Sequence, residues 1–424
     1  MPQRPEHAGT EEHGGPPDTA HFVTHVTEAG EVRDMRTSEA IYNANGQKLI
    51  EAGQPLDRRL FERLTTHKLL RPLDASIDVA EPVDRAALRA TSERIAEEDP
   101  LTRALMAVAS RPREAVAVPS SLALDPALAG KLSILQERMP EAFEHAIQVS
   151  LGATLLGMEL RPPDTAFARD LATAGLFHDI GYLHIDPAIF ESRAPLTPEQ
   201  ERQLRSHPVI AWLTLKRFPA CHPGASHAVL QHHERLDGSG YPRGHTGETL
   251  EPAGRCLAVM ELASALCGRQ DPAALSAILK GHAGQLDGDA LRVLLQAMDH
   301  CPVAESVPQE TGFPVDWEAL RAGVECVEQG LERMERLDPD LQAILRRHLE
   351  PLTRLLDRAG LRGLPLDLIR ESIAEDASLG VETAALQNDV RYRLRLLARE
   401  LPDTDEELPE ALRDWTRRLR EATG

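Results

Sequence analysis

Apolar residues recur with helical spacing along most of this chain, and only a short N-terminal region departs from that pattern. From about residue 121 onward, apolar positions repeat every three or four residues and are interrupted by proline and glycine clusters. This spacing is typical of amphipathic helices. Before it, two short apolar stretches flank Asn45-Gly46, which is a strong hairpin signal. Asp57 is expected to cap a helix that continues to Lys68.

The pattern predicts a mainly α fold, with a small α+β module before the main helical part and a helical region after it. The glycine-rich stretch 236–247 is predicted to be a loop, and 304–314 a linker. We expect a disordered leader at 1–20, the α+β module at 21–80, a helical linker at 81–120, the main helical domain at 121–303 and a helical C-terminal region at 304–424. Within the last region the helices are predicted at 316–337, 339–359, 365–378, 381–400 and 407–421.

Composition narrows the class of protein. The 424 residues include 47 Lys and Arg against 67 Asp and Glu, a net charge of −20. Such an acidic chain is not a nucleic-acid-coating protein, which needs a basic surface. No apolar run approaches a membrane span, and the N-terminus lacks a signal-peptide pattern. The five cysteines form no CxxC pair, which favours a reducing compartment, so a cytoplasmic location is expected.

Histidines are concentrated in one part of the chain: eight of the 17 lie within the 89 residues from 145 to 233. Glu141 and His145 are four residues apart in a helix predicted for Gln136–Gly157, and therefore share a face. His178-Asp179 follows a predicted helix, Phe167–Phe177. Taken alone, each of these is more often an ordinary structural or surface feature than part of a metal site.

Three further groups extend the series. His207-Pro208 opens a predicted helix, because proline suits the first helical turn. His232-His233-Glu234 is a rarer string. Glu261 lies inside the apolar run Cys256–Ala263, where a carboxylate is expected to be paired or coordinated.

Together these residues offer imidazole nitrogens and carboxylate oxygens, the ligand set that suits iron, manganese or zinc. They outnumber the ligands that one ion needs, which points to two or three ions. Paired ions roughly 3.5–4 Å apart can activate water and stabilise the leaving oxygen of a phosphoryl transfer. Spacing along the chain does not by itself show that the residues converge.

The order of these motifs resembles the HD-GYP domain family, a branch of the HD phosphohydrolases. The resemblance rests on His178-Asp179-Ile-Gly181, then His207-Pro208, then His232-His233-Glu-Arg-Leu-Asp-Gly-Ser-Gly240-Tyr241-Pro242-Arg-Gly-His-Thr-Gly247. It continues through the stretches 255–261 and 275–287 and covers about residues 121–300.

The resemblance implies an HD-type helical bundle around a bi- or trinuclear metal centre that hydrolyses cyclic di-GMP. His178 and Asp179 would be catalytic, with Asp179 as the bridging carboxylate, and Glu261 stands where the family usually has Asp. The implied metal ligands are Glu141, His145, His178, Asp179, His207, His232, His233 and Glu261.

The implied substrate-binding residues are Tyr182, Gly240, Tyr241, Pro242 and Arg243. Gly240, Tyr241 and Pro242 form the signature loop, which borders the substrate and is implicated in partner binding. Tyr182 is a departure, because the family typically has a lysine there that faces the substrate phosphate.

A second departure is the stretch 264–272, which replaces an acidic and arginine-rich family segment and keeps only Arg269 in a shifted position. Arg243 could supply the missing charge or serve an ordinary surface role. Metal binding is therefore expected to be intact and substrate binding altered.

Two functions from different classes follow. The first is a metal-dependent phosphodiesterase, with iron or manganese favoured, that opens cyclic di-GMP to pGpG, and further to GMP as an open alternative, in bacterial second-messenger signalling. The second is a catalytically weak or inactive scaffold that binds metal or cyclic dinucleotide and a protein partner at the signature loop or the C-terminal helices. The tail residues leave open whether that region docks a partner, forms a homodimer or regulates access to the site. The arginines at 391–399 are interpreted as a solvated helix face.

Overall fold

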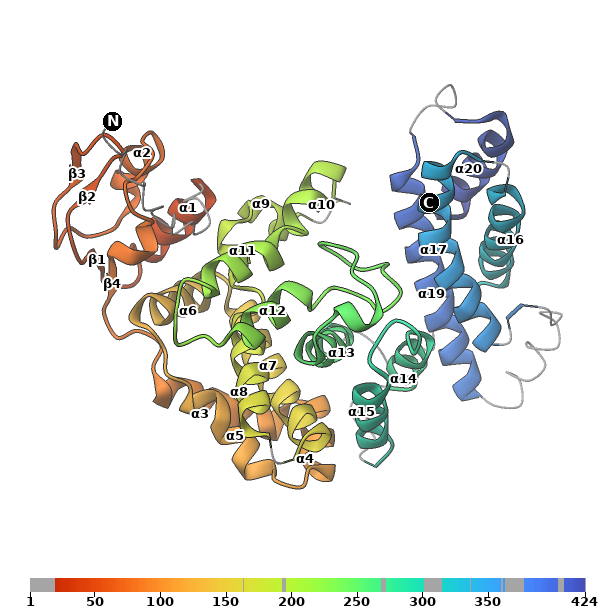
Figure 1. Cartoon of the computed structure of the whole chain (residues 1–424), viewed down its shortest axis with the longest axis horizontal. Coiled ribbons are helices and arrows are strands. Elements are labelled where there is room, and N and C mark those ends of the chain that lie inside the picture. The colour runs from red at the N-terminus through yellow and green to blue at the C-terminus, as the bar shows by residue number, and fades with distance from the viewer. Residues whose placement is uncertain are drawn as a thin grey trace, which may run out of the picture. The chain divides into compact units, whose positions relative to one another are not determined.

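The computed structural model covers the whole chain, and its description is confined to the residues placed with certainty. These are residues 20–162, 164–192, 196–267, 272–300, 315–335, 337–359, 361–362, 377–402 and 408–423. The leader at 1–19, the linker at 304–314 and nearly all of the helix predicted at 365–378 lie outside them. The mainly helical fold expected from the sequence is confirmed, because only two small two-stranded sheets accompany the helices (Figure 1).

The chain folds into two compact units. The first comprises residues 1–84, 123–144 and 177–226, and the second comprises 85–122, 145–176 and 227–424. Helices with residues in the first unit are α1 (Ala20–Ala29), η1 (Arg58–Leu60), α2 (Phe61–Thr65), η2 (Leu73–Ser76), α6 (Pro126–Arg138), α7 (Pro140–Leu160, first residues), η3 (Ile180–His184), α9 (Pro187–Glu191), α10 (Pro198–Leu204), α11 (His207–Leu215) and α12 (Pro223–Gln231, first residues).

The strands of the first unit form the α+β module. Strand β1 (Met35–Thr37) pairs antiparallel with β4 (Ile77–Val79), and β2 (Ile41–Tyr42) pairs antiparallel with β3 (Lys48–Ile50). The predicted hairpin is confirmed: it turns through Asn45-Gly46, where Gly46 has a φ of 78°. Glycine suits this turn because it adopts a positive φ without steric cost.

The helix predicted from Asp57 is shorter than expected. The Asp57 side chain does accept a hydrogen bond from the amide of Arg59, but α2 ends at Thr65 instead of Lys68. Beyond that point the backbone pairs with the hairpin, since the carbonyl of Lys68 accepts a 2.8 Å hydrogen bond from the amide of Ala44. Hydrogen bonding to the hairpin has therefore replaced the last helical turn that the local sequence pattern predicted.

The second unit is entirely helical among its described residues. Pro100 and Pro112 are the first residues of α4 and α5, a position where proline is tolerated. Its helices are α3 (Arg85–Glu98), α4 (Pro100–Val108), α5 (Pro112–Ser121), most of α7, α8 (Thr165–Phe177), η4 (Gly247–Thr249), α13 (Pro252–Leu266), α14 (Pro272–Gly281), α15 (Gly288–His300), α16 (Trp317–Met334), α17 (Pro339–Arg358), α19 (Ala377–Glu400) and α20 (Glu410–Thr423).

Among the described residues, the last four helices are α16, α17, α19 and α20, and they pack around one leucine-rich core (Figure 1). Leu349 and Leu394 are buried in it, and the fully buried Trp415 donates an indole hydrogen bond of 2.9 Å to the carbonyl of Cys326. We call these four helices the C-terminal bundle. Its helix α19 also packs against α14, so the bundle is continuous with the preceding helices of the same unit.

Two further observations concern the described residues as a whole. None of their helices is both long enough and apolar enough to cross a membrane. Among them, Cys221, Cys256 and Cys326 are free thiols.

Candidate metal centre

Helix α7 carries the first two predicted ligands, Glu141 and His145. The helix begins at Pro140 and not at the predicted Gln136, which belongs to α6. The break falls at Met139, because a residue before proline is disfavoured in helical conformation. Glu141 is consequently exposed in the first turn of α7, whereas His145, one turn later, is half-buried.

Two residues of α13 contact the His145 ring, one at each nitrogen. The Nε2 atom lies 2.9 Å from Oε2 of Glu261, and the Nδ1 atom lies 3.3 Å from the hydroxyl of Ser264. Glu261 and Ser264 are three residues apart, so both project from the same face of α13. Glu261 is only 7% exposed, in keeping with the expectation that a carboxylate in this apolar helix has a partner.

In the first unit, the carboxylate of Asp179 lies between two imidazoles. Its Oδ2 atom is 3.0 Å from Nε2 of His178, and its Oδ1 atom is 3.3 Å from Nε2 of His207. All three side chains are buried. These nitrogen and oxygen atoms belong to the donor types that divalent first-row metals accept.

Gly181 explains how these segments approach so closely. A Cβ atom at this position would lie 2.3 Å from the carbonyl oxygen of His207, a distance that no side chain tolerates. The glycine of the His-Asp-Ile-Gly motif therefore lets η3 pack directly on the start of α11, which brings Asp179 to His207.

Backbone hydrogen bonds fix the orientation of two further rings. Nδ1 of His207 lies 2.7 Å from the carbonyl of Leu204, and Nδ1 of His232 lies 2.6 Å from the carbonyl of Val229. A carbonyl only accepts, so in each ring Nδ1 carries the proton and Nε2 carries the lone pair. This is the usual way in which a protein orients a metal-binding histidine.

The signature loop is built directly onto His233. The Tyr241 amide donates a 3.1 Å hydrogen bond to the carbonyl of His233, and the two rings stack with centroids 4.6 Å apart. Gly240 has no room for a side chain, since a Cβ would lie 2.4 Å from the His233 carbonyl oxygen. The buried carboxylate of Glu234 accepts hydrogen bonds from the amides of Arg243 and His245 at 2.8 and 3.1 Å, which holds the far side of the loop.

Among the described residues, two groups of side chains could hold a metal ion, and every member is a ligand expected from the sequence. The members are His145, His178, His207, His232, His233 and Glu261. Asp179 is tied to two of them by the contacts given above. Glu141 belongs to neither group.

The predicted substrate residues have different environments. Tyr182 is half-buried, and its ring centroid lies 4.6 Å from that of His207 and 5.0 Å from that of Phe190. Arg243 is exposed. Arg269 lies outside the described residues. His184, which matched no motif, is buried and stacks on Phe22 with centroids 4.6 Å apart.

The sequence did not single out Ser264 or Glu234 as functional residues. Glu234 could have been noticed from its position between the histidine pair 232–233 and the glycine-rich loop, because a carboxylate there can accept hydrogen bonds from loop amides. The signal for Ser264 is its position one helical turn beyond Glu261 on an otherwise apolar helix. Both side chains support expected ligands or the signature loop.

Comparison with known families shows which class of domain this region resembles. Residues 131–288 match the family model described as "HD domain". Over these residues the chain is therefore similar to HD domains. HD domains bind divalent metal ions, which agrees with the histidine and carboxylate groups found here.

The chain is similar to curated bacterial phosphodiesterases. It is 36% identical over 106 residues to a cyclic di-GMP phosphodiesterase of Thermotoga maritima, covering 24% of this chain and 28% of that one. It is 27% identical over 177 residues to one of Pseudomonas aeruginosa, covering 40% and 42%. It is 28% identical over 138 residues to a 3′3′-cGAMP-specific phosphodiesterase of Vibrio cholerae, covering 32% and 31%. The chain thus spans less than half the length of each relative.

A solved structure is also similar: an HD-GYP protein, Bd1817 of Bdellovibrio bacteriovorus. The TM-score is 0.34 at 15% identity, covering 64% of this chain and 97% of that one.

Proposed function

We propose that this chain is a metal-dependent phosphodiesterase that hydrolyses cyclic di-GMP to the linear dinucleotide pGpG. The observation that carries the proposal is the buried Asp179 carboxylate with an imidazole nitrogen at each oxygen. Burying three such polar side chains together is costly unless a cation or proton satisfies them. The nature of the relatives' substrates supports the choice of a cyclic dinucleotide.

The ligand set fits two or three divalent ions. Iron or manganese is favoured over metals that prefer sulfur ligands, because the donors here are nitrogen and oxygen. When bound, such ions lower the pKa of water to near neutrality and stabilise charge on phosphate oxygens. The proposed ligands are Glu141, His145, His178, Asp179, His207, His232, His233 and Glu261.

The other residues would prepare these ligands and the substrate. The backbone carbonyls at Leu204 and Val229 hold two rings in the tautomer that presents Nε2, while Ser264 supports His145. Tyr182 offers a neutral hydroxyl, which donates a hydrogen bond to a phosphate oxygen but adds no charge. In the reaction, a water oxygen bonds to phosphorus, the bond from phosphorus to the 3′ oxygen breaks, and that oxygen takes a proton.

The test is turnover of purified protein, loaded anaerobically with iron or manganese, with the product identified chromatographically. We expect pGpG from the wild type, and loss of both bound metal and product in His178→Ala and Asp179→Ala. His222→Ala is the matched control, because His222 is an exposed histidine in the same region. Cyclic di-GMP binding without product after long incubation would instead support the scaffold function, and full activity of metal-free protein would refute the proposal.

A further inference from the structure

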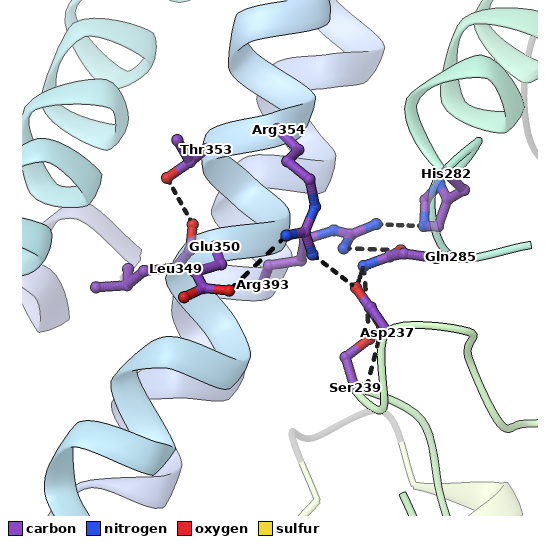
Figure 2. Close-up of polar contacts among 9 residues, drawn as sticks. All are labelled: Asp237, Ser239, His282, Gln285, Leu349, Glu350, Thr353, Arg354 and Arg393. Atoms are coloured by element: carbon purple, nitrogen blue, oxygen red, sulfur yellow. Dashed lines mark hydrogen bonds and ion pairs between the residues drawn. The ribbon is translucent and has the colours of Figure 1, made fainter. Parts of the chain in front are cut away.

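Asp237 lies near the start of the glycine-rich stretch 236–247, which contains the signature loop. It is held by a residue from the C-terminal bundle (Figure 2). Its Oδ2 atom lies 3.3 Å from Nη2 of Arg354 on α17 and accepts a 2.9 Å hydrogen bond from Nε2 of Gln285. Its Oδ1 atom accepts from the amide and hydroxyl of Ser239 at 3.0 and 2.6 Å. The carboxylate, with a side chain only 11% exposed, therefore joins the loop to a distant helix.

A second arginine of the bundle acts on the same point through Gln285. Nη1 of Arg393, on α19, donates a 3.2 Å hydrogen bond to Oε1 of Gln285, and Nη2 contacts Nε2 of His282. Nδ1 of His282 donates a 2.8 Å hydrogen bond to the carbonyl of Ile278, so Nε2 is the ring nitrogen that accepts from Arg393. Figure 2 shows the Arg354 side chain directed toward Asp237 and the Arg393 side chain directed toward Gln285 and His282. The interpretation of residues 391–399 as a solvated face is thus wrong for Arg393, which the helix packing draws into this network.

Gln285 is the residue that these contacts share. Its side chain is 6% exposed, its amide nitrogen reaches Asp237, and its backbone carbonyl accepts a 2.8 Å hydrogen bond from the amide of Leu236. The loop is therefore gripped at two consecutive residues, Leu236 and Asp237. Four residues further on, Tyr241 stacks on the metal-ligand candidate His233.

We propose that Arg354 and Arg393 are positioning residues, through which the C-terminal bundle holds the signature loop in the conformation that orients Tyr241 and His233. The inference rests on the proposed function only for its kinetic readout. It assigns to the C-terminal bundle the role of positioning the loop, whereas the sequence of this region left its role open. An exposed ion pair alone contributes little. Here the Asp237 side chain is only 11% exposed, Gln285 is buried, and each makes several hydrogen bonds.

The experiment compares Arg354→Glu with Arg346→Glu in the full-length protein. Arg346 lies on the same helix and pairs with Glu350 at 3.5 Å, as Arg354 also does at 3.8 Å. Among the residues that the structure describes, Arg346 makes no hydrogen bond or ion pair with the loop. The first readout is hydrogen exchange of residues 236–247, which needs no activity. The second is the split between kcat and KM for cyclic di-GMP, with metal content measured in parallel.

We expect Arg354→Glu to raise the exchange rate of the loop amides and to lower kcat/KM on the order of tenfold, since small misplacements of a site are costly. Arg346→Glu should change neither. The exchanged pair Asp237→Lys with Arg354→Glu should recover part of the loop protection, and Arg393→Gln should reproduce the effect with the bundle folded, as judged by Trp fluorescence.

Unchanged loop exchange in both Arg354→Glu and Arg393→Gln, with the bundle folded, would overturn the inference. If wild-type protein showed no hydrolysis, the proposed function would fail, yet the exchange comparison would still decide whether the bundle holds the loop.

Discussion

The ring of Tyr241 stacks on the imidazole of His233, with centroids 4.6 Å apart and planes inclined by 23°. The backbone hydrogen bond between the same two residues fixes this relation at 3.1 Å. The tyrosine of the signature loop therefore acts on a metal-ligand candidate directly, as the partner that limits the rotation of its ring. The functional meaning of the Gly-Tyr-Pro motif in this chain is in part the orientation of His233.

Removing this aromatic contact should weaken metal binding. We expect Tyr241→Ala to raise the dissociation constant for Mn²⁺ by about tenfold, as is usual when a residue that orients a ligand is lost. Tyr241→Phe keeps the stack and should bind metal as the wild type does. Calorimetric titration of metal-free protein measures both, and equal affinities in all three proteins would contradict a role for the ring.

Ser264 offers a similar test on the other side of His145. In Ser264→Ala, Nδ1 of His145 loses the hydroxyl 3.3 Å away, and the ring is free to turn from Glu261. A loss of about tenfold in metal affinity or activity is expected. Ser264→Thr retains the hydroxyl and serves as the conservative control. Metal content after dialysis separates the two variants, and unchanged content in Ser264→Ala would show that the contact is incidental.

The candidate site was more predictable than the fold around it. His178, Asp179 and His207 are set by local motifs, and Gly181 is required where two backbones meet, so a pattern of residues records a three-dimensional contact. The start of α7 could also have been read from Met139-Pro140, since proline disfavours helix before it. The spacing of apolar residues continues from α6 into α7 across Met139, so this spacing alone did not reveal where one helix ends and the next begins.

The contacts of the C-terminal bundle could not be predicted in the same way. Arg354 and Arg393 resemble many other arginines on amphipathic helices, and only the packing of α19 on α14 selects them. Asp237 and Gln285 are 48 residues apart. Long-range pairing of this kind carries no local spacing rule, unlike the three- and four-residue spacing within a helix.

Tyr182 provides a gain-of-function test. Replacement by lysine would place a cation at the position where the resemblance of the sequence motifs implies one, and a cation near a phosphate contributes up to about 4 kcal/mol before desolvation is subtracted. We expect Tyr182→Lys to raise kcat/KM for cyclic di-GMP on the order of tenfold, mainly through KM. Tyr182→Phe, which keeps the ring contact with His207, should lower it slightly. A fall in kcat/KM for the lysine variant would show that the ring itself is needed.

His25 should make stability depend on pH. Burial first, and the nearby Arg138 second, lower the pKa of His25 from 6.5 to about 4. The unfolded chain therefore takes up a proton before the folded one, so stability is full above pH 6.5 and falls as the pH drops toward 4. The loss approaches about 3 kcal/mol across that window. His25→Leu should flatten the slope of unfolding free energy between pH 7 and 4.5, whereas the exposed His222→Leu should leave it unchanged. Identical slopes in wild type and His25→Leu would refute the assignment.

Asp74 ties the α+β module to the helices of the first unit. Its carboxylate lies 3.1 Å from Nζ of Lys131 and 2.9 Å from Nη1 of Arg217, and both Asp74 and Lys131 are almost fully buried. Burial raises the pKa of Asp74, but the two cations outweigh it and lower the pKa from 3.8 to about 2. The stabilisation is therefore present above pH 3.8 and is lost as the pH falls through 2.

Asp74→Asn should destabilise the protein by about 3–5 kcal/mol, because it leaves two cations facing each other without a counter-ion. Lys131→Met should cost less, since Arg217 still pairs with the carboxylate through two nitrogens. Urea unfolding at pH 7 ranks the variants. Glu93→Gln, which breaks an exposed pair with Arg89, is the control and should have little effect. A loss in Asp74→Asn no larger than in this control would mean that the buried triad does not hold the module in place.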